Sequence, residues 1–112
     1  SIMNIYDTAN NLASEIRNSN EYKDYAKIKK EIFENSDKKA KLQEFEQARY
    51  TTQLEAMQGK KQDENVMNSL QEMYAKLIED EQIKKYFDAE MKFNVMIADV
   101  NKIIAEAVKD VL

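Results

Sequence analysis

The 112-residue sequence has no proline and only one glycine. These two residues break helices and form many turns, and an average protein contains about 5% proline and 7% glycine. A chain almost without them has few turns, so its regular elements must be long. Much of the sequence is lysine, glutamate, glutamine, alanine, leucine and methionine, which are good helix formers. The composition therefore predicts an all-α fold.

Cysteine and histidine are also missing. The chain therefore has no thiol for a disulfide, for nucleophilic catalysis, or for binding zinc or an iron–sulfur cluster. It also lacks the commonest general base and metal ligand. Carboxylates remain, in the pair Glu31 and Glu34 and in the run Glu79-Asp80-Glu81. Such clusters are usually solvated surface, so we expect no enzyme and no cofactor; a carboxylate-only metal site in a helical bundle is the alternative.

The net charge is −4 and the isoelectric point about 5.0, which disfavours binding to DNA. No apolar run approaches the roughly 20 residues that cross a bilayer, and no signal-peptide pattern precedes the first helix. We expect a cytoplasmic protein that does not bind membranes, folded as one helical domain over residues 1–112. Ser1 and Ile2 precede Met3, which we expect to be the natural start, with the two earlier residues left over from an expression vector.

Apolar residues recur every three to four positions in five segments, which is the pattern of amphipathic helices. To within about two to four residues, these segments cover 4–17, 20–34, 37–58, 64–78 and 81–111. Ser19, Asp63 and Asp80 stand where a side-chain oxygen can cap the first turn of a helix. Gly59 stands where a left-handed residue would end one. The pattern predicts an antiparallel bundle or hairpin of long helices.

The last segment carries an apolar stripe along its whole length. At about 1.5 Å per residue this helix would exceed about 45 Å, whereas a compact 100-residue domain has a radius of gyration near 13 Å. One copy of the chain would not cover such a stripe, so we expect a second subunit, most simply a homodimer. The candidate interface consists of Phe93, Met96, Ile97, Val100 and Ile104. Glu90 also lies on this stripe, either paired with a lysine across the interface or at the stripe's edge.

The middle segment has apolar residues on two sides, which indicates two different neighbours. One side includes Leu42 and Phe45. The other consists of Tyr50, Leu54 and Met57 at positions i, i+4 and i+7, and we expect it to be a second contact face. The sequence thus favours a protein that works by helix-mediated association.

Charge is unevenly distributed along the chain. Residues 21–41 hold seven lysines against five acids, and residues 63–112 hold six lysines against eleven acids. This asymmetry could orient two subunits or attract a charged partner. An RNA-associated factor with a basic groove formed on dimerisation is one alternative function, although no arginine cluster or aromatic RNA-binding motif supports it. A purely structural helical dimer is another.

Three stretches resemble the YlbF/YmcA family of small helical proteins from Gram-positive bacteria, and its YheA-type branch most closely. They are Asn4-Ile5-Tyr6-Asp7-Thr8-Ala9-Asn10-Asn11-Leu12, Glu55-Ala56-Met57-Gln58-Gly59, and the run from Phe93 to Ile104. The resemblance implies an antiparallel helical fold that dimerises. It also implies a regulatory role in a group that acts with the protein YaaT in competence, sporulation and biofilm formation and is linked to RNA maturation by RNase Y. Family paralogues or RNase Y-associated proteins would then be partners.

Overall fold

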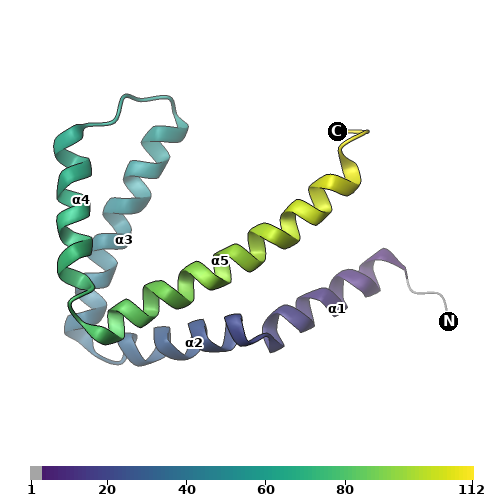
Figure 1. Ribbon diagram of the computed structural model, residues 1–112, viewed down its shortest axis with the longest axis horizontal. Helices are drawn as coiled ribbons and strands as arrows, with labels where there is room; N and C mark the ends of the chain where they lie inside the picture. Colours follow the sequence, from purple (N-terminus) through teal and green to yellow (C-terminus); the bar gives the residue numbers. More distant parts are fainter. Residues whose placement is uncertain (1–3) are drawn as a thin grey trace. The chain divides into compact units, whose positions relative to one another are not determined.

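The computed structural model describes residues 4–112, which form five α-helices and no β-strand (Figure 1). The helices are α1 (Ile5–Asn18), α2 (Asn20–Phe33), α3 (Ser36–Met57), α4 (Glu64–Leu77) and α5 (Glu81–Val108). The predicted all-α class and its five helical segments are confirmed. The expected natural start at Met3 lies outside the described residues.

Side chains at the helix starts satisfy amide groups that have no partner within the helix. The Asn4 Oδ1 atom accepts a hydrogen bond of 2.9 Å from the Asp7 amide at the start of α1. The Ser19 hydroxyl accepts from the Tyr22 amide over 3.2 Å and donates to the Ile16 carbonyl over 2.6 Å, so it joins the end of α1 to the start of α2. The predicted cap at Ser19 is confirmed.

Asp63 and Asp80 cap α4 and α5, as the sequence predicted. The Oδ1 atom of Asp63 accepts from the Asn65 amide over 2.8 Å. The Oδ1 atom of Asp80 accepts from the amides of Gln82 over 2.9 Å and Ile83 over 3.3 Å. Because these caps act over two or three residues, the sequence alone locates the helix starts well.

The end of α3 agrees with the prediction from the sequence, whereas α5 ends earlier than predicted. Gly59 has a φ of +76°, the left-handed conformation that a glycine adopts without steric cost, and it follows the end of α3 as predicted. The last helix was expected to reach about Val111 but ends at Val108. There the amides of Val111 and Leu112 both turn back to the Val108 carbonyl, over 3.1 Å. At about 1.5 Å per residue α5 is about 42 Å long, slightly shorter than expected.

The chain divides into two compact units. The described part of the first comprises residues 4–28 and 86–112, and the second comprises residues 29–85. In the first unit, α5 runs in the opposite direction to α1 and the start of α2 (Figure 1). That residues 1–112 act as one domain stays a prediction.

The second unit contains the larger core. Its helices α3 and α4 pack against each other as an antiparallel hairpin (Figure 1). The ring of Phe45 on α3 lies 6.0 Å from that of Tyr74 on α4. The buried side chains of this unit are Ile32, Leu42, Phe45, Leu77 and Ile83. This core buries one side of α3 and leaves the other side exposed.

Candidate functional site

The predicted interface on α5 is only partly covered by its own unit. Phe93, Met96, Ile97 and Val100 are half-buried, and Ile104 is 53% exposed. The Phe93 ring lies 6.1 Å from that of Tyr22 and 5.6 Å from that of Tyr25, both on α2. One end of the predicted interface therefore packs against its own chain, and the other end is open to solvent.

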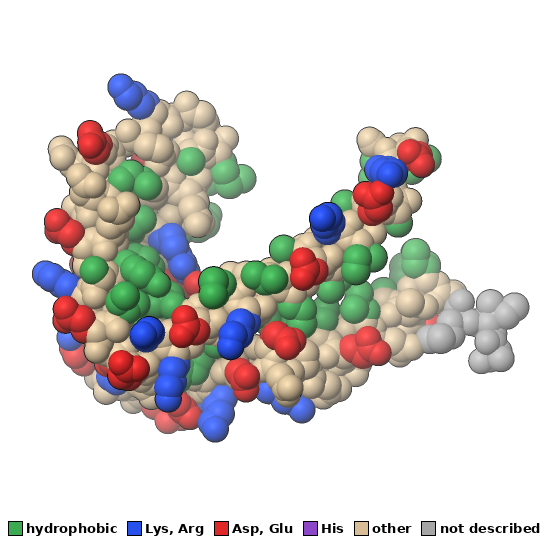
Figure 2. Space-filling view, viewed as in Figure 1, with side chains coloured by type: hydrophobic (Ala, Val, Ile, Leu, Met, Phe, Trp, Pro, Cys, Tyr) green, Lys and Arg blue, Asp and Glu red, His purple; other side chains and the backbone are tan. Residues whose placement is uncertain are grey.

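Other apolar residues of α5, beyond the five of the predicted interface, are also exposed. Met91 is 60% exposed, Val95 55% and Ile103 71%. Together with Met96 and Val100 they line an open groove of about 480 Å³, with Glu21, Lys92 and Asp99 as its charged lining residues. Figure 2 shows hydrophobic side chains gathered along α5 on the side that faces α1 and α2. This groove is a candidate site for apolar contact with another helix.

Glu90, on the apolar stripe of α5, takes part in a polar contact with α2. The Tyr25 hydroxyl donates to Oε2 of Glu90 over 3.3 Å and lies 3.4 Å from the Tyr86 hydroxyl. Because the one proton of Tyr25 goes to the carboxylate, its oxygen is left to accept from Tyr86. Tyr86 is only 1% exposed, so this contact fixes α2 against α5 from within the unit. Glu90 thus has a tyrosine partner in its own unit, which the sequence did not indicate.

The second predicted face lies on α3. Tyr50 is 61% exposed, Leu54 40% and Met57 84%, whereas Leu42 and Phe45 on the other side of the helix are buried. Four exposed glutamines flank the exposed face on the helix: Gln43, Gln47, Gln53 and Gln58. An apolar centre with a polar rim is the arrangement typical of protein–protein contact surfaces.

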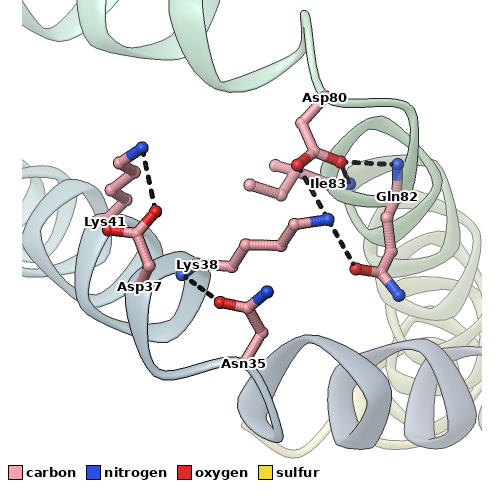
Figure 3. Close-up of polar contacts among 7 residues, drawn as sticks. All are labelled: Asn35, Asp37, Lys38, Lys41, Asp80, Gln82 and Ile83. Carbon is pink, nitrogen blue, oxygen red and sulfur yellow. Dashed lines mark hydrogen bonds and ion pairs between the residues drawn. The ribbon is translucent and has the colours of Figure 1, made fainter.

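The acidic run at the start of α5 has a structural role. The Lys38 ammonium lies 2.9 Å from Oδ2 of Asp80 and donates to Oε1 of Gln82 over 2.9 Å, while the other Asp80 oxygen caps α5 (Figure 3). A second pair, Lys41 with Asp37 at 3.2 Å, lies on the surface of α3 (Figure 3). Within residues 4–112, no three acidic side chains are grouped so that they could hold a metal ion. Asp80 therefore ties α3 to the start of α5.

The hydrogen bond from Lys38 holds the pKa of Asp80 below its ordinary value of 3.8, and the Ile83 and Gln82 amides act in the same direction against partial burial. A carboxyl with a lowered pKa stabilises the fold above its unfolded-state pKa, and this stability is lost as the pH falls through the folded-state pKa.

Asp80→Asn keeps a cap oxygen but removes the charge. We expect the variant to melt at a lower temperature than the parent protein near pH 7, and the difference to shrink at about pH 3 and below. Circular dichroism melts across this range measure it. The control Asp37→Asn removes an exposed pair, with side chains 62% and 76% exposed, and should change the melting temperature less. A difference for Asp80→Asn that does not vary with pH would contradict the assigned ion pair.

None of the helices in residues 4–112 has the length and apolar character needed to cross a membrane.

Comparison with known proteins gives one consistent result. Residues 5–109 match the family described as control of competence regulator ComK, YlbF/YmcA. A UPF0342 protein of Listeria welshimeri is 33% identical over 108 residues, covering 96% of this chain and 92% of the relative. A UPF0342 protein of Desulfitobacterium hafniense is 36% identical over 117 aligned positions, covering 98% and 89%. These relatives come from Gram-positive bacteria, and their names state no activity. Placement in the YheA-type branch stays a prediction.

Proposed function

The chain belongs to the YlbF/YmcA family, whose description is control of the competence regulator ComK, and from this premise we propose that it is a non-enzymatic regulatory protein that acts by helix-mediated association. It forms a homodimer through α5, and the exposed face of α3 contacts a partner protein in the cytoplasm. The observation that carries the proposal is the row of large apolar side chains left in solvent on α5: Met91, Val95, Ile103 and Ile104, each more than half exposed.

Burial of these side chains against a partner stabilises the complex through the hydrophobic effect. Full burial of one such side chain is worth roughly 1.5–3 kcal/mol. Monomeric soluble proteins rarely expose contiguous apolar patches of more than a few hundred Å², and larger patches mark interaction sites. A partner that covers α5 therefore gains several kcal/mol of apolar burial to set against the entropy lost on association.

We expect Ile97→Asp and Val100→Asp to abolish self-association while leaving the helices folded. A carboxylate cannot be desolvated cheaply against an apolar partner, so we expect the dissociation constant to rise by at least about a hundredfold. Light scattering over a range of concentrations measures the mass, and circular dichroism checks helix content. Ala75→Asp is the matched control because Ala75 is exposed and lies on α4, outside the proposed interface on α5. A folded Val100→Asp variant that still forms a dimer would remove this residue from the interface.

The proposed process is the one in the family's description, control of competence. The resemblance noted in the sequence extends it to sporulation and biofilm formation, through family paralogues or proteins associated with RNase Y. In this proposal Tyr50, Leu54 and Met57 on α3 are the partner contact, because they form an exposed apolar centre with a polar rim.

Affinity capture from cells of the native bacterium tests this regulatory role. We expect the tagged protein to retain a family paralogue or an RNase Y-associated protein. The Leu54→Asp variant should retain at least about tenfold less of that partner. Thr51→Asp is the control, since Thr51 is exposed on α3 outside the apolar face. Retention of the same protein by both variants would exclude the α3 face as the contact. Retention of none of these proteins by the parent would count against the regulatory role.

A further inference from the structure

Helix α1 is amphipathic, yet it has no buried residue. Its apolar face consists of Ile5, Ala9, Leu12, Ala13 and Ile16, with Tyr6 at its edge. Ile5 is 79% exposed and Tyr6 77%, whereas Leu12 and Ile16 are half-buried. The helix is nevertheless capped, by Asn4 at its start and by the Ser19 amide, which donates to the Ile16 carbonyl, at its end. Its own unit therefore leaves a well-formed apolar helix face uncovered.

On α5, the exposure of the stripe that contains Tyr86 and Phe93 also increases towards the free end of the helix. Near the α2 contact, Tyr86 is buried and Phe93 is half-buried, whereas towards the end of the helix Ile103 is 71% exposed and Ile104 53%. The two helices belong to one unit and run in opposite directions, so the start of α1 and the end of α5 are the two exposed ends of the pair (Figure 1). The ring contacts of Tyr22 and Tyr25 with α5 lie at the other end of the pair.

Resting on the proposed self-association, we propose that α1 of one copy packs on the apolar face of α5 of a second copy. Each copy then contributes both helices, and the interface is a bundle of four helices. The interface predicted from the sequence involved only α5. This proposal adds Ile5 and Tyr6 of α1, which are the most exposed large apolar residues of that helix.

A second copy suits this surface because of its apolar area. A two-fold axis uses every contact twice. Eight apolar side chains on each copy supply several hundred Å² of surface, the order of the roughly 800 Å² that each partner buries in a standard interface: Ile5, Tyr6, Leu12, Ile16, Ile97, Val100, Ile103 and Ile104.

The absence of cysteine allows a direct test by disulfide trapping, because introduced thiols are the only ones present. One tagged copy carries Tyr6→Cys, and a copy of different size carries either Val100→Cys or Ile104→Cys. The two are mixed under reducing conditions, exchanged, oxidised and separated on a non-reducing gel. With each thiol on a different copy, only an intermolecular contact can join them. A disulfide requires Cα atoms within about 7 Å, so it reports close approach.

We expect a mixed covalent dimer with at least one of the two α5 positions, at a yield several-fold above that with Ala98→Cys, which lies on the other side of α5. If the parent protein is a dimer by light scattering and neither α5 position exceeds the Ala98→Cys level, the contribution of α1 is wrong while the self-association stands. If the parent protein is a monomer at all concentrations, both proposals fall.

Discussion

Replacing Leu42 by alanine is expected to lower the free energy of unfolding by about 2–5 kcal/mol. Leu42 lies on the inner side of α3 and is 0% exposed, within a core that also contains Phe45, Leu77 and Ile83. Truncation removes buried apolar surface and leaves a cavity that the neighbouring helices can fill only in part. A small domain has a total stability of about 5–15 kcal/mol, so the loss would be a large fraction of it.

Leu54→Ala is the matched control, since it makes the same substitution on the same helix. Leu54 is 40% exposed, so we expect a loss below about 1 kcal/mol. Urea denaturation followed by circular dichroism gives both values, with all proteins at one concentration because self-association adds to apparent stability. Equal losses for the two variants would show that both sides of α3 are covered in the isolated protein, which would contradict the exposure of the side that carries Leu54.

The helix boundaries could be predicted because the interactions that set them are local. Ser19, Asp63 and Asp80 accept hydrogen bonds from amides two or three residues away, and Gly59 supplies its own left-handed conformation. The spacing of apolar residues also predicted two apolar sides of α3, of which the side with Leu42 and Phe45 is buried. These features need no knowledge of which other segment lies nearby.

The partners of each face could not be predicted in the same way. Periodicity placed Phe93 on an apolar stripe but did not show that Tyr22 and Tyr25 of the same chain would cover it. The contact between Tyr25 and Glu90 spans 65 positions in sequence, and the pair Lys38–Asp80 joins two different helices. An amphipathic pattern predicts which side of a helix is apolar, but tertiary packing decides which other segment covers that side.

Tyr86→Ala is expected to cost about 3–5 kcal/mol of unfolding free energy, the range for truncating a large buried aromatic residue. Tyr86 is 1% exposed, and its ring lies 5.4 Å from that of Phe87 and 5.5 Å from that of Tyr25. Removing the ring would therefore loosen the contact that holds α2 to α5. Tyr6→Ala is the control for the same change at a side chain that is 77% exposed, and we expect it to cost below about 1 kcal/mol in the isolated chain at low concentration.

Tyr86→Phe tests the contribution of the hydroxyl group to stability apart from that of the ring. The variant keeps the ring and loses the hydrogen bond to Tyr25, so we expect a loss of about 0.5–1.5 kcal/mol. The double variant with Tyr25→Phe should lose less than the sum of the two single losses, because both remove the same bond. Urea denaturation measures all four proteins of this cycle. If Tyr86→Phe were as damaging as Tyr86→Ala, the polar contact and not the ring would dominate. If the single losses simply added, the two hydroxyls would not interact, and the geometry that places Tyr25 between Tyr86 and Glu90 would be wrong.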